Sequence, residues 1–518
     1  MTSATEPTHS YDPLALRIIT VCAMMGVMMQ SMDSTISNVA LPYMQGSLEA
    51  SRDQVTWVLT SYVVAAAIMT APAGWLAARF GRKNLLVVSL AGFTISSMLC
   101  GAAQTLDEMI LFRVLQGVFG AAMAPLSQSM MVDLYPPHKR GQTMAVFSMG
   151  IMVAPILGPT LGGYLTDAYS WRWVFYINAP FGLASVIGML LFFRDSHHDK
   201  ALRFDWFGFS MLGIAIGTLQ LMLDRGTTLD WFSSGEIVIE ALTAGLCVYL
   251  FVIHFFLSER SFLPRGMFSD RNFVSSLVIL FVLSLCIFAG TALLPPYLQN
   301  LGGYSVVQTG ILMAPRGIGS IISMYWVGRV VMRTDPRHIM AAGLAIMLSA
   351  NWEMSRWTPE VSTAWLMATT FVQGMGTGMM FVPMSVVSFT TLPAQFRTDA
   401  AALTNLMRNL GSAIGISITS TILVNSTQIV HAQLAEHANP FNRGLTLNAP
   451  SMYWNPQLNF GAEQLNAIIN YNAQVIAYAN DFLFIFLTGS TAFIAIYLLR
   501  RPPAIPDPEL RTHALASE

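Results

Sequence analysis

Residues 16–42 read LRIITVCAMMGVMMQSMDSTISNVALP, a run apolar enough to cross a bilayer although it contains a carboxylate, Asp33. A charged side chain at the centre of a membrane costs at least about 2.5 to 3.5 kcal/mol, so such a residue normally faces a polar interior and has a function there. Gln30, Asp33 and Ser37 are spaced by three and four residues, and Ser34 stands beside them. On a helix these positions share one face. The polar stripe predicts the wall of a cavity inside a membrane protein.

The composition supports a polytopic membrane protein of the all-α class. The chain has 518 residues, of which 54% are hydrophobic and 11% charged, and its mean hydropathy is +0.54. A soluble globular protein of this size would not carry such a surface. A transmembrane helix needs about 20 mainly apolar residues. The predicted spans are fourteen: 15–41, 55–78, 84–103, 108–132, 142–166, 172–193, 206–224, 236–257, 272–294, 307–329, 338–354, 362–386, 400–424 and 481–499.

The distribution of Lys and Arg predicts that both termini are cytoplasmic. Of the 27 basic residues, nineteen fall in segments that this orientation places inside and five in segments that it places outside. Such an excess is the positive-inside bias of membrane proteins. The other three, Arg113, Arg316 and Arg408, lie within predicted spans. The first apolar run is too long for the core of a signal peptide, so we expect it to be an uncleaved anchor.

Several classes of chemistry have no support in the sequence. The four cysteines lie inside spans without CxxC spacing, so we expect no metal site and no disulfide. No GK[ST], HExxH or GxSxG pattern occurs, which argues against ATP hydrolysis and against an enzyme. The net charge of -1 gives no indication of a nucleic-acid partner. We therefore expect no cofactor, and a proton gradient as the driving force.

Arg113 is the second charge that bears on the first span. Counted from the outer ends of their spans, Asp33 and Arg113 lie at similar depths, roughly 9 to 12 Å below the surface at 1.5 Å per residue. A cation nearby favours the ionised acid, whereas a dry environment favours the neutral acid, so small rearrangements could move a proton on and off Asp33. We predict that this pair couples transport to protons. A static ion pair that only fixes helix packing is the alternative.

The second span ends in GWLAARFGRKNLL, residues 74–86, which resembles the loop signature of the major facilitator superfamily. The matching residues are Gly74, Arg79, Gly81, Arg82 and Lys83. Ala78 stands where that family usually carries an acid, which puts a conformational latch based on this acid in doubt. The spacing RxxxGxxG from Arg113 also resembles the family's fourth span, whose arginine is associated with proton coupling.

The fifth span reads GIMVAPILGPTLGG, residues 150–163, and has small residues at every fourth position. Such a face lets another helix approach closely. Its core resembles the signature of exporters within the superfamily. The residues concerned are Gly150, Ala154, Gly158, Pro159, Gly162 and Gly163. WRWVFYINAP, MDSTISNVALP and LQLMLDRGTTLDWFSSGEI resemble the drug:proton antiporters with fourteen spans, in particular the EmrB-type multidrug exporters.

The resemblance implies two six-helix halves, 15–193 and 272–499, with two inserted helices within 194–271 and cytoplasmic tails at 1–14 and 500–518. A weak internal repeat supports the division into two halves, because LQGVFGAAMAPLS in the fourth span resembles VQGMGTGMMFVPMS in the twelfth. Residues 425–480 are predicted to be a long outer loop with an amphipathic helical pattern. The location implied is the bacterial inner membrane, with small hydrophobic drugs as substrates.

The function implied is proton-driven export by alternating access, together with an EmrA-type periplasmic adaptor and a TolC-type outer-membrane channel. A dedicated metabolite exporter or a proton-coupled importer on the same fold is the alternative, and buried charges argue against a channel. Arg316 and Arg408 either contact acidic substrate groups or pair with carbonyls. The predicted cavity residues are Gln30, Ser34, Ser37, Asn38, Gln116, Arg316 and Arg408.

Overall fold

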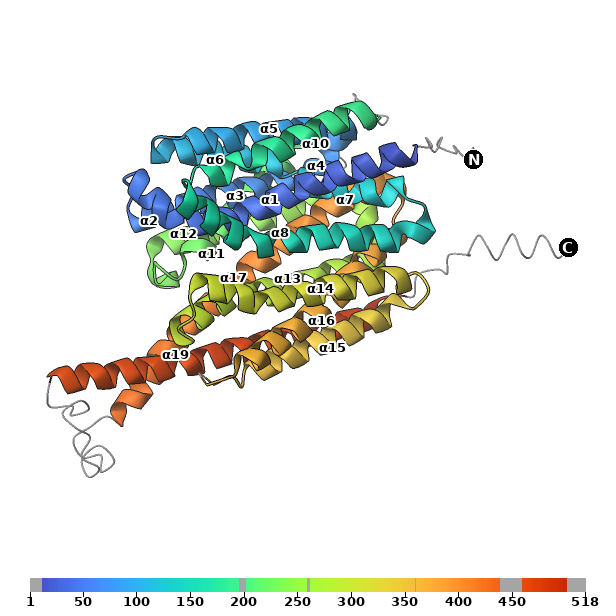
Figure 1. Ribbon diagram of the computed structural model, residues 1–518. Coiled ribbons are helices and arrows are strands. Elements are labelled where there is room, and N and C mark those ends of the chain that lie inside the picture. The colour runs from blue at the N-terminus through green and yellow to red at the C-terminus, as the bar shows by residue number, and fades with distance from the viewer. Residues whose placement is uncertain (1–11, 195–201, 259–260, 359, 438–458, 501–518) are drawn as a thin grey trace.

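The computed structural model describes residues 12–194, 202–258, 261–358, 360–437 and 459–500, and within these ranges it contains helices and no strand (Figure 1). The helices up to residue 192 are α1 (Pro13–Ser47), α2 (Arg52–Val55), α3 (Trp57–Thr70), α4 (Ala73–Phe80), α5 (Arg82–Ala102), α6 (Leu106–Gly120), α7 (Met123–Leu134), α8 (Arg140–Ala168), α9 (Trp173–Tyr176) and α10 (Asn178–Phe192). The later ones are α11 (Trp206–Arg225), α12 (Gly235–Leu257), α13 (Arg271–Pro296), α14 (Val306–Val330), α15 (Pro336–Met354), α16 (Thr363–Thr390), α17 (Arg397–Glu436), α19 (Asn459–Ser490) and α20 (Ala492–Leu498). Short helical turns are η1 (Pro137–Lys139), η2 (Trp231–Ser233), η3 (Arg265–Ser269), η4 (Tyr297–Leu301) and η5 (Ala394–Phe396).

The long helices form two groups that lie side by side (Figure 1). In the first group α1 packs against α8 and α10, and α6 packs against α3 and α5. In the second group α16 packs against α14 and α15, and α17 packs against α13 and α19. α11 and α12 pack on each other, and α11 also contacts α3 and α17. This is an all-α arrangement of two helical halves with two additional helices.

Each of the fourteen predicted spans falls on a helix or on a broken pair of helices. Nine of the described helices are long and apolar enough to cross a membrane, or ten if the pair α3 and α4 counts as one span. That pair is bent by 59° around Pro72, whose ring does not fit a continuous helix. The total of fourteen crossings stays a prediction.

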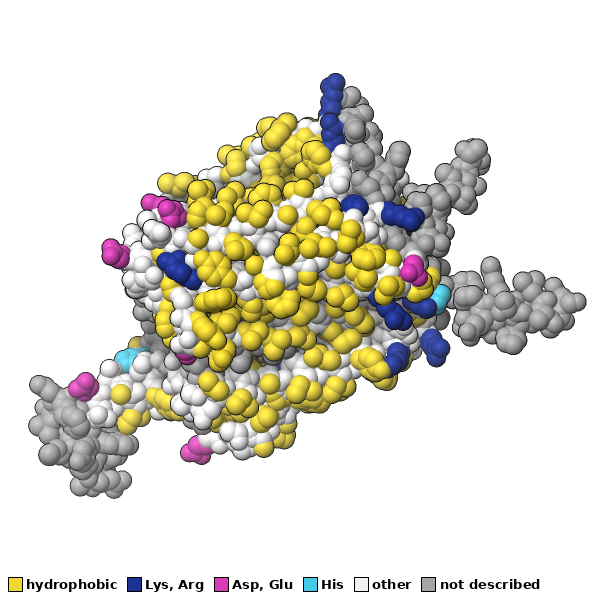
Figure 2. All heavy atoms as spheres, turned by 45° about the horizontal axis from the view of Figure 1, so that its top comes forward, with side chains coloured by type: hydrophobic (Ala, Val, Ile, Leu, Met, Phe, Trp, Pro, Cys, Tyr) yellow, Lys and Arg dark blue, Asp and Glu magenta, His cyan; other side chains and the backbone are white. Residues whose placement is uncertain are grey.

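The surface divides into an apolar flank and a basic end. Apolar side chains cover the flank in Figure 2, and large residues such as Leu191 and Leu257 are more than 70% exposed. Most Lys and Arg in this view lie at the end of the bundle where α1 begins and α20 ends. We call this the basic end, marked by Arg82, Arg140 and Arg397. A flank of this kind suits lipid rather than water.

Within the predicted outer segment 425–480 most of the described residues are helical, in agreement with its amphipathic pattern. α17 continues to Glu436 and α19 begins at Asn459, and both project beyond the bundle (Figure 1). The ring of His431 lies 2.8 Å from the Asn466 side chain, so the two projections contact each other. Apolarity marks where a span ends, but a polar helix can continue past that point. Residues 438–458 lie outside the described residues.

Candidate functional site

Asp33 and Arg113 meet inside the first half. Arg113 Nη1 donates a hydrogen bond of 2.6 Å to Asp33 Oδ2, and both side chains are fully buried. The other carboxylate oxygen, Oδ1, accepts from Gln116 Nε2 at 2.9 Å and from Asn178 Nδ2 at 3.1 Å. We call these four residues the carboxylate site. Three donors from α6 and α10 hold one acid of α1, so the carboxylate is well satisfied in this conformation.

Arg113 has few other ways to compensate its charge. Its Nη1 also donates to Gln116 Oε1 at 2.9 Å, while Nε and Nη2 have no hydrogen-bond partner among the described residues. The guanidinium lies 5.2 Å from the ring centre of Tyr62 and 4.9 Å from that of Phe175, which adds cation–π attraction. Asp33 is therefore the acid on which this buried cation depends.

Glycines after Arg113 let the neighbouring helices approach the site. A Cβ atom on Gly117 would lie 2.5 Å from the carbonyl oxygen of Tyr62, and one on Gly120 would lie 3.1 Å from the Phe93 ring. The glycines of RxxxGxxG thus allow α3 and α5 to close around Arg113. This close contact keeps the site dry and makes the Asp33–Arg113 pair hard to separate without moving helices.

In this conformation the carboxylate site faces the interior of the first half, and the other predicted cavity residues near it differ in exposure. Gln116 and Ser37 are buried inside this half, and Ser37 Oγ has no hydrogen-bond partner among the described residues. Gln30 and Ser34 are half-buried, and Asn38 is exposed. The helix spacing was right about a shared face, but it could not say whether that face meets a cavity or other helices.

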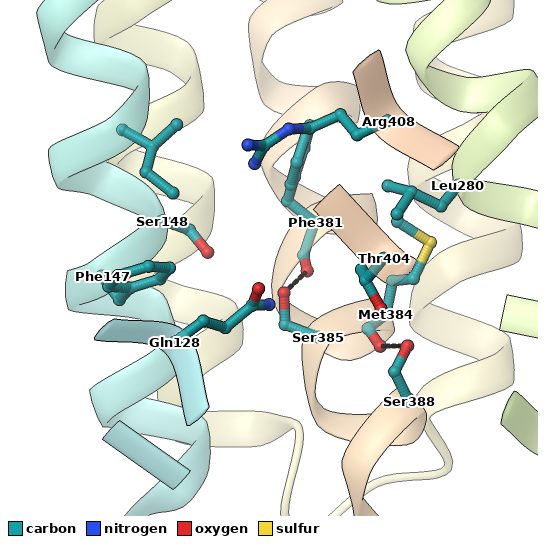
Figure 3. A pocket seen from close by; sticks show the side chains of 11 residues that line it. Gln128, Phe147, Ser148, Leu280, Phe381, Met384, Ser385, Ser388, Thr404 and Arg408 are labelled. Atoms are coloured by element: carbon teal, nitrogen blue, oxygen red, sulfur yellow. Dashed lines mark hydrogen bonds between the residues drawn. The ribbon is translucent and has the colours of Figure 1, made fainter. Parts of the chain in front are cut away.

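A separate cavity lies between the halves (Figure 3). Gln128 of α7 and Ser148 of α8 face Ser385 of α16 across it, and Arg408 reaches in from α17. Its volume is about 20 Å³, which is room for about one water molecule and far below the roughly 300 to 1,000 Å³ of drug-sized pockets. The site is closed in this conformation. The lining residues are Gln128, Phe147, Ser148, Ile151, Leu280, Phe381, Met384, Ser385, Ser388, Thr404 and Arg408.

The two buried arginines of the second half have different surroundings. Arg408 Nη2 donates to Asn405 Oδ1 at 2.5 Å, and Asn405 Nδ2 donates to Gln128 Oε1 at 3.1 Å, so this chain of bonds crosses between the halves. No carboxylate pairs with Arg408 among the described residues. Arg316 instead donates to the Ile287 carbonyl at 3.1 Å and is absent from the cavity lining. The two predicted alternatives were pairing with carbonyls and contact with acidic substrate groups. Arg316 pairs with a carbonyl, whereas Arg408 faces the cavity.

The halves also meet at the basic end. Asp133 of α7 pairs with Arg82 at 2.5 Å within its own half and with Arg397 of the other half. Beside this pair, Gly74 of α4 leaves room for Asp399 of α17, which a Cβ atom would strike. Asp133 thus provides an acid at the basic end, although Ala78 replaces the acid that the family usually carries in the loop signature. The remaining loop residues are placed as follows: Gly81 has φ of 88°, and Arg79 Nη1 is buried without a hydrogen-bond partner among the described residues.

The small-residue face of α8 packs against α1. A Cβ atom on Gly150 would lie 3.0 Å from Met24, one on Gly158 would strike Thr35, and one on Gly162 would lie 3.3 Å from the Ile36 carbonyl oxygen. The predicted close helix approach is confirmed, and its partner is the helix that carries Asp33. Ala154 is buried, Gly163 has open space around it, and the Pro159 side chain lies outside the described residues.

Sequence reasoning missed several polar residues. Asn178 lies in the quoted motif WRWVFYINAP and Gln128 directly follows the quoted LQGVFGAAMAPLS, but neither drew attention, because amides within spans are common and carry no charge. Asp133 stands just after a predicted span and looked like a loop residue. Asp481 is the first residue of the last predicted span and is fully buried. Its position at a span boundary was the available signal.

Comparisons with known proteins agree with this architecture. The family model described as Major Facilitator Superfamily matches residues 23–416. The chain is 37% identical over 443 residues to the multidrug export protein EmrB of Escherichia coli (strain K12), with 85% of each chain covered. It is 34% identical over 505 residues to the fatty acid resistance protein FarB of Neisseria gonorrhoeae, covering 95% of this chain and 98% of that one.

The fold is also similar to that of a solved transporter. The crystal structure of the human organic anion transporter MFSD10 (TETRAN) matches with a TM-score of 0.57 and 13% sequence identity. The match covers 92% of this chain and 100% of that chain. At this identity the likeness concerns the fold alone.

Proposed function

Because this chain belongs to the major facilitator superfamily, it is a multi-pass membrane transporter rather than an enzyme, and we propose that it exports hydrophobic and amphipathic toxic compounds in exchange for protons. The observation that carries the proton coupling is the buried Asp33–Arg113 pair at 2.6 Å. A buried pair of this kind is strongly destabilised when one partner loses its charge. Protonation of Asp33 can therefore drive a rearrangement.

The proposed cycle couples this pair to the movement of the halves. A proton from the outer side neutralises Asp33, and Arg113 then keeps a charge without a counter-ion. Arg113 and Gln128 lie on one span, α6 and α7, so a shift of Arg113 also acts on the bond between Gln128 and Asn405. Rocking of the halves opens the closed cavity to one side at a time, and loss of the proton inside restores the pair.

The cavity lining supports amphipathic substrates, including acidic ones. Apolar side chains such as Phe147, Phe381 and Met384 stand beside serines and the cation of Arg408, which has no carboxylate partner in the described chain. The names of the relatives EmrB and FarB refer to multidrug export and to fatty acid resistance. A carboxylate on an apolar substrate would suit this lining. A dedicated exporter of one metabolite, or a proton-coupled importer, is the alternative, and the direction of transport separates export from import.

We further propose the inner membrane, cytoplasmic termini and a tripartite assembly. The basic end fits the cytoplasmic side by the positive-inside bias. The projections of α17 and α19 leave the bundle at the opposite end, which this orientation places in the periplasm (Figure 1). They offer a docking surface for an EmrA-type adaptor that leads to a TolC-type channel.

Transport by the full chain in vesicles tests the coupling. Asp33→Asn keeps the shape of the side chain but cannot exchange a proton, so we expect loss of proton-driven efflux with substrate binding retained. Asp107→Asn is the matched control, because Asp107 is an exposed acid at the start of α6. Full proton-linked efflux by Asp33→Asn would contradict the proposal, and loss of efflux in both variants would show that the assay does not report on Asp33.

A further inference from the structure

The second half contains its own buried acid, Asp481 of α19. Its side chain is fully buried, and neither carboxylate oxygen has a hydrogen-bond partner among the described residues. An ionised carboxylate without donors or a cation costs several kcal/mol or more in a dry interior, so the group takes a proton instead. Asp33, with three donors, and Asp481, with none among the described residues, therefore have opposite surroundings in this conformation.

Among the described residues no ion pair involves Asp481. Around this part of α19 the titratable groups are phenols and a thiol: Tyr478 one turn away, Tyr297 of η4, and Cys286 of α13, whose Sγ donates to the Ile485 carbonyl at 3.6 Å. Four of the charged or ionisable side chains on the packed helices have partners elsewhere. These contacts are Arg337 with Asp335, Glu353 with Trp365, Arg408 with Asn405, and His431 with Asn466.

A cavity at the end of the bundle where α17 and α19 project reaches Tyr478, three residues from Asp481. It has a volume of about 350 Å³ and lies between η4, α17 and α19, where the two projections leave the bundle. Tyr478 forms part of its wall, and Tyr478 and Asp481 are three residues apart and so share a helix face. Water in this cavity would end one helical turn from the carboxyl group. The lining residues are Asn300, Leu423, Val424, Thr427, Gln428, Gln474 and Tyr478.

The two halves can be compared through a glutamine that each carries at a matching position. Gln116 of the carboxylate site and Gln373 of α16 occupy matching positions in the internal sequence repeat, LQG and VQG. Gln116 donates to Asp33, whereas Gln373 donates to Asn351 Oδ1 at 3.0 Å and leaves its own Oε1 without a partner among the described residues. A Cβ atom on Gly290 would lie 3.5 Å from Gln373 and 3.9 Å from Ile485, one turn below Asp481. The interior of the second half thus also contains a buried glutamine, and its buried acid lies on the last span.

We propose that Asp481 is a second proton-binding carboxyl group, which exchanges its proton with the outer side through the cavity between η4, α17 and α19. The site takes a proton and no other ligand. Its role in the transport cycle rests on the proposed proton antiport, whereas its protonation and its access from outside do not. Each half would then carry one proton-binding acid in its interior. Asp481, the acid of the second half, is charged only when that half changes its packing.

Infrared difference spectroscopy of the purified full chain tests the protonation. A protonated carboxyl group gives a carbonyl stretching band that ionised acids lack. We expect such a band at neutral pH in the unaltered protein and in Glu463→Gln, and its loss in Asp481→Asn. Glu463 is the matched control because it is an exposed acid on the same helix. An identical band in Asp481→Asn, in a protein that melts at the same temperature as the parent, would overturn the proposal.

A cysteine variant tests the route. The four native cysteines are buried, so Gln474→Cys places one accessible thiol on the cavity wall. We expect a bulky membrane-impermeant thiol reagent, added outside, to slow deuterium exchange of the Asp481 band, whereas the same label on Glu463→Cys leaves it unchanged. Equal exchange rates in the two labelled variants would refute the route.

Transport separates this proposal from the proposed function. With Asp481→Asn we expect efflux to continue with one proton fewer per substrate, whereas Asp33→Asn stops proton-driven efflux. An unchanged ratio together with loss of the infrared band would remove Asp481 from the cycle but leave the Asp33 mechanism intact.

Discussion

The carboxylate site makes a quantitative prediction about Asp33, Arg113 and their double variant. Both side chains are fully buried and joined at 2.6 Å, so Asp33→Asn leaves an arginine charge without a counter-ion. Breaking a buried pair in this way costs about 3 to 5 kcal/mol. Arg113→Gln costs less, about 1 to 3 kcal/mol, because Asp33 can take a proton and keep the bonds from Gln116 and Asn178, whereas a guanidinium cannot lose its charge.

The double variant should recover much of this loss. With Asp33→Asn and Arg113→Gln combined neither charge of the pair remains, so the penalty of an uncompensated buried charge is removed. We therefore expect the double variant to be more stable than Asp33→Asn alone, yet still unable to couple efflux to protons.

Thermal unfolding of the purified chain, followed by tryptophan fluorescence, measures the four proteins. The matched control is the same cycle on Arg225 and Glu236, a pair at 2.6 Å whose side chains are 29% and 53% exposed, for which we expect less than about 1 kcal/mol. Additive effects of Asp33→Asn and Arg113→Gln would refute the energetic argument. Proton-linked efflux by the double variant would leave the static ion pair as the remaining explanation.

Three further predictions concern other contacts between helices. Asp133→Asn removes the partner of Arg82 and Arg397; because these pairs are partly exposed, we expect a cost of about 1 kcal/mol and a roughly fivefold rise in the labelling rate of a Ser385→Cys thiol from the basic end, with Asp107→Asn unchanged. Gly374→Ala would drive a methyl group into the Arg316 carbonyl, so we expect about 1 to 3 kcal/mol of destabilisation in thermal unfolding, whereas Gly163→Ala, with open space around it, should be neutral. Arg408→Gln should lower the export of fatty acids more than that of neutral or cationic drugs, and an equal loss for all substrates would show that Arg408 acts through Asn405 rather than through substrate.

The sequence was sufficient for the helices and for the pairing of Asp33 with Arg113. Apolar runs of fixed length predict spans, and two opposite charges at one depth predict a meeting because neither can remain alone in an apolar medium. The small-residue face of α8 was equally clear, since a small residue at every fourth position favours close packing of helices. Each of these features depends on local spacing, which a sequence shows directly.

Other features depended on how the helices rotate and where they end. Ser37 and Gln116 are polar and correctly spaced, but only packing decides that they face the interior of one half rather than the cavity. The Asp133–Arg397 pair joins residues 264 positions apart, and no local pattern relates them. The helical projections of α17 and α19 are polar, so a search for apolar segments ends before they do.

In the proposed cycle the fourth span connects Asp33 to the contacts at the basic end. α6 carries Arg113 and Gln116, whereas α7 carries Gln128, which bonds to the other half, and Asp133, which pairs with Arg397. About twenty residues separate Arg113 from Asp133, which is about 30 Å along a straight helix. The backbone stays in the right-handed helical region at Ala121 and Ala122, and residues 106–134 form one apolar span. A displacement of α6 on protonation of Asp33 would therefore reach the Gln128 and Asp133 contacts through α7, so neutralising the acid would act on the contacts at the basic end.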